Sequence, residues 1–127
     1  MSHSAPQILY VDSESACCTL AGLLLASSGQ SEVTTADSAE EALQLMSARS
    51  FDLYIFDEPW RDRSALELCR RVRQKDRKAP ILIFSVLQSE MDRDRAFKAG
   101  ASEYLIKPDD VNRLAEVAER LLNGFTG

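Results

Sequence analysis

The chain alternates short, almost continuous apolar runs with longer segments in which apolar residues recur at helical spacing. The apolar runs predict strands, because a strand covered on both faces carries few polar residues. These strands span residues 7–11, 32–36, 51–57, 79–85 and 102–108. The intervening segments predict helices at residues 14–28, 38–49, 64–75, 89–100 and 109–124. Ser38 and Glu41 have the spacing of a capping box, and Gly29 and Gly100 follow the ends of two of these helices.

Five strands that are each followed by a helix predict an α/β domain with (βα)5 order. Because crossovers between parallel strands are right-handed, this order gives a doubly wound, five-stranded parallel sheet with helices on both faces. The 127 residues fit one domain with its own core. We expect a single domain over residues 1–127, with an N-terminal tail at 1–6. Residues 124–127 are either a C-terminal tail or the start of a linker to an output domain that this sequence does not include.

Composition narrows the classes of function. With 45% apolar and 28% charged residues, the chain is typical of a globular protein. Its net charge of −5 argues against direct nucleic-acid binding, which requires a basic surface. The longest run of apolar residues and glycine, at residues 20–26, is far shorter than the ~20 residues that span a bilayer. The N-terminus also lacks the features of a secretory signal, so we expect a cytoplasmic protein without membrane contact.

Polar side chains end four of the predicted strands. They are two carboxylates, a hydroxyl and an ammonium: Asp12, Asp57, Ser85 and Lys107. In open parallel sheets, binding sites lie beyond the carboxyl ends of the strands, where the strand order reverses. One strand-ending aspartate is more often a helix cap or a loop residue. Four such residues at the same depth instead indicate a shared functional cleft.

The segments ILYVDSES, FDLYIFD, LELCRRVR, PILIFS and AGASEYLIKP together resemble the response-regulator receiver domain of two-component signalling, over about residues 7–123. The resemblance implies a flavodoxin-like fold and phosphoryl transfer to Asp57 from a histidine kinase or a histidine phosphotransfer protein, with Mg²⁺ required. It further implies that Asp12 belongs to the acidic pair near the metal. Ser85 and Lys107 then contact the phosphoryl group, and Tyr104 is the switch residue.

The chemistry of these residue types suits that assignment. A carboxylate that attacks a phosphoryl group depends on positioning and on neutralisation of charge. Mg²⁺ commonly takes one or two carboxylates together with phosphate and water. Lys107 would supply a compact positive charge. Ser85 would donate a hydrogen bond to the phosphoryl group only when that group is present. Such a difference in contacts can shift the equilibrium between two conformations.

The sequence departs from the family pattern in two places. The second acid of the pair is Ser13, a poor Mg²⁺ ligand whose simplest interpretation is a helix N-cap. Glu14 is a candidate replacement ligand, although an acid in the first turn of a helix is the simpler interpretation. In the loop after Asp57, the family's usual proline is Arg61. Pro59 still offers the backbone carbonyl that the family uses as a metal ligand.

Two functional interpretations therefore stay open. The first is a receiver that accepts phosphate on Asp57 with weakened Mg²⁺ binding, which makes the chain a phosphoprotein and not an enzyme. The second is a degenerate receiver that acts as a phosphorylation-independent protein-interaction module. A phosphatase with an aspartate nucleophile would want a second acid at the position of Pro59. A nucleotide binder would want a glycine-rich turn after the first strand, which is absent from the sequence.

The resemblance also predicts two structural details. The Lys107–Pro108 peptide is expected to be cis, which would aim the lysine into the cleft. Output is expected through the fourth helix, fifth strand and fifth helix, at residues 90–99, 103–106 and 111–122. Within that surface, Tyr104 is expected to be at least partly exposed and to contact a partner protein or an output domain.

Overall fold

The computed structural model describes residues 5–12, 31–57, 64–85, 89–106 and 113–123. Within these ranges there are five strands and four helices. The strands are β1 (Gln7–Asp12), β2 (Glu32–Ala36), β3 (Leu53–Asp57), β4 (Ile81–Ser85) and β5 (Glu103–Ile106). The helices are α2 (Ala39–Ala48), α3 (Ser64–Lys75), α4 (Glu90–Ala99) and α5 (Leu114–Leu122). The helix predicted at residues 14–28 lies outside the described residues.

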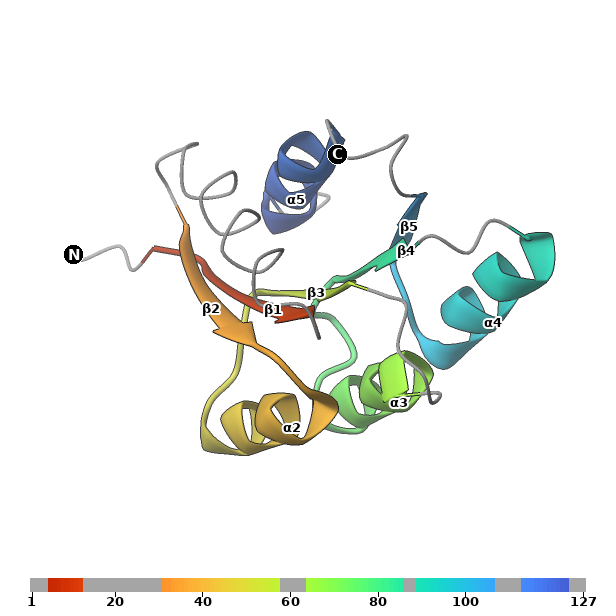
Figure 1. Cartoon of the computed structure of the whole chain (residues 1–127). Coiled ribbons are helices and arrows are strands. Elements are labelled where there is room, and N and C mark those ends of the chain that lie inside the picture. The colour runs from red at the N-terminus through yellow and green to blue at the C-terminus, as the bar shows by residue number, and fades with distance from the viewer. Residues whose placement is uncertain (1–4, 13–30, 58–63, 86–88, 107–112, 124–127) are drawn as a thin grey trace.

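The strands form one parallel sheet in the order β2-β1-β3-β4-β5. β1 lies between β2 and β3, so the direction in which the chain adds strands reverses at the gap between β1 and β3. The helices α2 and α3 cover one face of the sheet, and α5 covers the other (Figure 1). The predicted doubly wound α/β fold is confirmed. No helix in the described ranges is long and apolar enough to cross a membrane.

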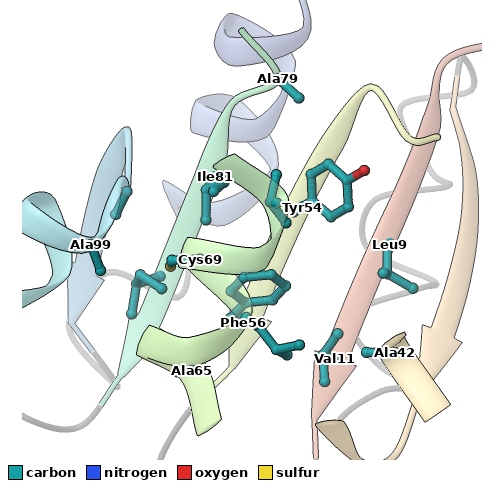
Figure 2. Close-up of a cluster of buried hydrophobic side chains, with 14 of the residues drawn as sticks. Leu9, Val11, Ala42, Tyr54, Phe56, Ala65, Cys69, Ala79, Ile81 and Ala99 are labelled. Carbon is teal, nitrogen blue, oxygen red and sulfur yellow. The ribbon is translucent and has the colours of Figure 1, made fainter. Parts of the chain in front are cut away.

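Alternation along each strand divides the core into two clusters, because successive side chains of a strand point to opposite faces. In β1, Leu9 and Val11 pack with side chains of α2, α3 and α4, as the close-up in Figure 2 shows in part. Ile8 and Tyr10 of the same strand pack with side chains of α5. The same alternation assigns the side chain of each strand-ending residue to one face of the sheet.

The helix ends largely follow the predicted capping signals. The hydroxyl of Ser38 accepts a hydrogen bond from the Glu41 N–H at 3.1 Å, which is one half of a capping box. The Glu41 carboxylate accepts from the Asp37 N–H at 2.8 Å, so the reciprocal bond is shifted by one residue. Gly100 ends α4 with a φ of 119°, a conformation that favours glycine. A Cβ there would also lie 2.6 Å from the Arg73 side chain.

Arg73 connects the end of α3 to the turn between α4 and β5. Its guanidinium donates to the carbonyl oxygens of Gly100 at 3.0 Å, Asp76 at 3.1 Å and Ala79 at 2.6 Å. A planar guanidinium with five N–H donors can serve several acceptors at once, which an ammonium cannot do in this geometry. Arg73 therefore fixes the entry to β4 and β5 at the amino edge of the sheet.

Some predicted boundaries need correction, and for β3 the reason is visible. β3 begins at Leu53 and not at residue 51. The Asp52 carboxylate accepts from the Gln7 N–H at 2.8 Å, and the Tyr54 hydroxyl accepts from the Phe51 N–H at 3.3 Å. The N–H groups of Gln7 and Phe51 thus bond side chains and not strand carbonyls, although the Asp52 N–H already donates to the Gln7 carbonyl oxygen at 2.7 Å; the regular strand starts at Leu53.

β4 is also shorter than predicted, whereas the predicted residues 107–108 of β5 and 109–112 and 124 of α5 lie outside the described residues. β4 begins at Ile81, directly after Pro80, whose nitrogen carries no hydrogen for the ladder. β5 covers residues 103–106, and α5 covers residues 114–122. In α3, Leu68, Cys69 and Val72 are buried, whereas Leu66 is only partly buried.

Candidate functional site

Asp12 and Asp57 face each other at the carboxyl edge of the sheet. Each is the last residue of its strand, and the two are register partners in the β1–β3 pair, at the point where the strand order reverses. Their exposed fractions are 4% and 3%. Two neighbouring buried carboxylates repel each other and lose hydration, so such a pair calls for a cation or for hydrogen-bond donors. The predicted position of both residues is confirmed.

Ser85 ends β4 and is completely buried. Asp57 is paired with Phe84, so Ser85 lies one residue further along the sheet, opposite Ile106 of β5. Because side chains alternate along each strand, those of Asp12 and Asp57 leave the backbone on the face covered by α5. The side chain of Ser85 leaves it on the face covered by α3 and α4. A group contacted by all three side chains must therefore lie beyond the end of the sheet and not over one face.

Tyr10 is a member of this site that sequence reasoning missed. Its hydroxyl donates a hydrogen bond to Asp57 Oδ2, and its side chain is 1% exposed. Tyr10 stands two residues before Asp12 on the same face of β1, opposite Ile55 of β3. It therefore reaches Asp57 along the diagonal between two neighbouring strands, a span that a long aromatic side chain covers. The available signal was a phenol on the same face as the strand-ending acid, two residues before it.

The carboxylate pair fits the donor chemistry of Mg²⁺, which prefers oxygen ligands and usually takes one or two carboxylates with water and phosphate. In the described part of the chain, no group of three or more His, Cys, Asp and Glu side chains could hold a metal ion. The fit therefore depends on Asp12 and Asp57. The other predicted site residues lie outside the described residues: Ser13, Glu14, Pro59, Lys107 and Pro108, with the predicted cis peptide.

The prediction that Tyr104 is at least partly exposed is wrong. Its exposed fraction is 4%, and it belongs to the core cluster under α2, α3 and α4. The physical reason is alternation: Tyr104 is the register partner of Ile83, which points to the same covered face. Arg93 of α4 lies over the ring, with its guanidinium carbon 5.9 Å from the ring centroid. The switch role of Tyr104 stays a prediction, and its expected exposure can no longer support it.

Comparison with known proteins identifies the family of this chain. Residues 8–119 match the family described as "Response regulator receiver domain". The chain belongs to the response-regulator receiver family. This receiver is 31% identical over 122 residues to the transcriptional regulatory protein ZraR of Escherichia coli O157:H7, covering 96% of this chain and 27% of that protein. It is 33% identical over 102 residues to the Bacillus subtilis alkaline phosphatase synthesis transcriptional regulatory protein PhoP, covering 80% of this chain and 42% of that protein.

Solved structures agree with this membership. The receiver matches a CheY-like response regulator receiver domain protein from Methanospirillum hungatei JF-1 with a TM-score of 0.85 and 26% identity, over 94% of this chain and 95% of that chain. It matches a receiver domain protein from Clostridium thermocellum with a TM-score of 0.82 and 28% identity, over 93% and 94% of the two chains. The chain spans about a quarter of the length of the ZraR relatives. It is thus a receiver domain of the two-component type with the flavodoxin-like fold.

Proposed function

We propose that this receiver accepts a phosphoryl group on Asp57 from a histidine kinase or a histidine phosphotransfer protein. The observation that carries the proposal is the facing pair of Asp57 and Asp12, both buried, at the switch point of the sheet. Because Asp57 is the last residue of a central strand, backbone pairing to both neighbours holds its carboxylate in place. Such positioning is a large part of catalysis in phosphoryl transfer.

The transfer is a displacement at phosphorus. One oxygen of Asp57 forms the new bond to phosphorus, and the bond from phosphorus to the donor's imidazole nitrogen breaks with its electron pair left on that nitrogen. Mg²⁺, when bound, supplies positive charge that offsets the charge of the carboxylates and the phosphoryl group. Asp12 is the second carboxylate available to hold it. Ser85 would donate its hydroxyl proton to a phosphoryl oxygen, and Lys107 would contribute the cation that its position after β5 predicts.

The proposal extends to output through α4, β5 and α5, to an output domain or a partner protein. Two contacts support this surface, because they tie both helices to β5. Arg93 of α4 covers the ring of Tyr104, and Arg120 of α5 donates to Glu103 at 2.8 Å. Phe97 is 40% exposed and lies one turn after Arg93, on the same side of α4. An exposed aromatic beside arginine is typical of protein interfaces.

We further propose that this receiver acts in the cytoplasm as a phosphoprotein and not as an enzyme. Its test is incubation with acetyl phosphate and Mg²⁺, followed by intact-mass spectrometry under acidic conditions. The wild type should gain one phosphoryl group. Asp57→Asn should gain none, while Asp94→Asn, which changes an exposed aspartate of α4, should behave as the wild type. An unlabelled wild type would reject the proposal and favour the phosphorylation-independent interaction module.

The output surface has a separate test by NMR. Beryllofluoride, a phosphoryl mimic, should shift the amide resonances of Tyr104 and Phe97 when Mg²⁺ is present. Residues of α2, which lies on the same face of the sheet but next to β1 and β2 at the other edge, serve as internal controls and should shift less. Shifts confined to β1 and β3 would contradict communication with α4 and β5.

A further inference from the structure

The contact between Tyr10 and Asp57 joins a neutral donor to the carboxylate that carries the proposed chemistry. The phenol arrives from the adjacent strand, two residues deeper in the sheet than Asp12, and ends on Asp57 Oδ2. Both side chains are almost completely buried. A hydrogen bond between buried groups is not weakened by competing bulk water, so this one affects the energy of the carboxylate directly.

We propose that Tyr10 is a positioning residue that stabilises the unphosphorylated carboxylate of Asp57 and thereby shortens the lifetime of the aspartyl phosphate. The inference rests on the proposed phosphorylation of Asp57 and adds to it a residue that tunes the reaction. Tyr10 contacts the acceptor carboxylate itself. Its effect is therefore on the balance between the two states of Asp57.

The direction of the effect follows from the charge of the acceptor oxygen. In the unphosphorylated protein the phenol donates to the Asp57 side chain, and a carboxylate accepts stronger hydrogen bonds than a neutral carbonyl oxygen. After transfer, one oxygen of Asp57 bridges to phosphorus and the other is a neutral carbonyl oxygen. The same phenol then makes a weaker bond. Tyr10 thus favours the carboxylate over the acyl phosphate.

Hydrolysis is the step in which this preference acts. Water attacks phosphorus, the bond from phosphorus to the Asp57 oxygen breaks, and its electron pair returns to the carboxylate while the protons of water go to phosphate and solvent. A donor that stabilises the returning charge lowers the barrier to this step. The same donor raises the barrier to phosphorylation, because it must be weakened as the carboxylate attacks.

The geometry also distinguishes the two oxygens of Asp57. Oδ2 is the oxygen that accepts from Tyr10, whose backbone lies two residues before the end of β1. The proposal assigns the bond to phosphorus to Oδ1 and the carbonyl of the acyl phosphate to Oδ2. Tyr10 would then orient the carboxylate in both states.

Tyr10→Phe tests the inference, because it removes the hydroxyl and keeps the ring in the cluster under α5. Tyr54→Phe is the matched control. Tyr54 is equally buried, and its hydroxyl bonds the Phe51 N–H at the opposite edge of the sheet. Burial raises the pKa of the Tyr54 phenol above its ordinary value, so this residue is also a neutral hydroxyl at working pH.

The measurement is the rate of labelling by acetyl phosphate and the rate of loss of the label after acetyl phosphate is removed, for wild type, Tyr10→Phe and Tyr54→Phe. Charge-assisted hydrogen bonds are roughly twice as strong as neutral ones. On that basis, the ratio of labelling rate to loss rate should rise roughly five- to tenfold in Tyr10→Phe alone. Urea unfolding of the three proteins measures the accompanying change in stability.

The outcomes separate the possible roles. Faster labelling with slower loss in Tyr10→Phe supports the inference, since general damage to the site would slow both rates. Unchanged rates, or two rates slowed by the same factor, would overturn it while leaving Asp57 as the acceptor. An absence of label in all three proteins would overturn the proposed function, and this inference with it.

Discussion

The burial of Tyr104 makes a quantitative prediction for the substitution Tyr104→Ala. The ring packs in the core beneath α4 and beside Ile83, and it is 4% exposed. Truncation to alanine would therefore remove a large buried ring from between the sheet and a helix, and the small neighbours Ala96 and Ala99 of α4 cannot fill the space. The main effect should be on stability and not on partner binding.

The magnitude follows from comparable buried aromatics. Phe→Ala and Trp→Ala substitutions in cores cost ~3–5 kcal/mol, and Tyr104→Ala should fall in that range. The contact with Arg93 adds less than ~1 kcal/mol, because the arginine is exposed. Domains have a free energy of unfolding of ~5–15 kcal/mol, so the variant would keep a reduced margin.

Urea unfolding followed by circular dichroism checks this value. With an m-value of ~2 kcal/mol/M, a loss of ~4 kcal/mol moves the midpoint down by ~2 M. Tyr104→Phe is the matched variant, because it keeps the ring, and its midpoint should stay much closer to that of the wild type. A midpoint for Tyr104→Ala within ~0.5 M of the wild type would refute the packing argument.

Three further predictions concern the Arg73 side chain, the serine at position 13 and the lowered pKa of Asp76. Arg73→Ala should cost ~2–4 kcal/mol in urea unfolding, because it deprives three carbonyl groups of a charged donor, and Arg73→Lys should recover less than half. Ser13→Asp should raise Mg²⁺ affinity ~10–100-fold in calorimetric titration, and it should lower the stability of the metal-free protein by repulsion from the two edge aspartates. The Lys78 N–H holds the pKa of Asp76 below its ordinary value, so the stability that this carboxylate contributes is present above pH ~4 and is lost as pH falls through the folded-state pKa. Asp76→Asn should thus be less stable than the wild type near pH ~6, and the gap should narrow as pH falls below ~4 towards the folded-state pKa; a gap that does not narrow in acid would contradict this reasoning.

The fold was largely predictable because each strand of a doubly wound sheet is covered on both faces. Apolar runs such as the one ending at Asp57 then stand out from helical segments by their lack of polar interruptions. The starts of strands were less predictable, because hydrogen bonds of particular side chains decide them. The carboxylate of Asp52 accepts from the Gln7 N–H of β1, and the hydroxyl of Tyr54 accepts from the Phe51 N–H just before β3; no apolar pattern encodes these bonds.

The residues of the site likewise include some that were predictable from the sequence and some that were not. Asp12, Asp57 and Ser85 were predictable because strand ends in a parallel sheet meet at one edge, whatever the details of packing. Tyr10 was missed because alternation gives the face of a side chain but not the acceptor that its hydroxyl finds. The exposure of Tyr104 was inferred from a family resemblance. Tyr104 is the register partner of Ile83, so its ring lies on the same covered face of the sheet, under α4.

Ser13 and Tyr10 are connected through one physical quantity, the negative charge at the carboxyl edge. The family pattern would put a third carboxylate beside Asp12 and Asp57, and the chain instead has the neutral Ser13 there. The phenol of Tyr10 adds a donor to one of the two carboxylates that remain. Fewer negative charges and an internal donor both lower the cost of burying this edge without a cation, since unpaired buried charge is expensive. On the proposed function, both features would therefore favour the metal-free, unphosphorylated state. On the two proposals above, such a receiver would bind Mg²⁺ more weakly, and its aspartyl phosphate would return to carboxylate more readily.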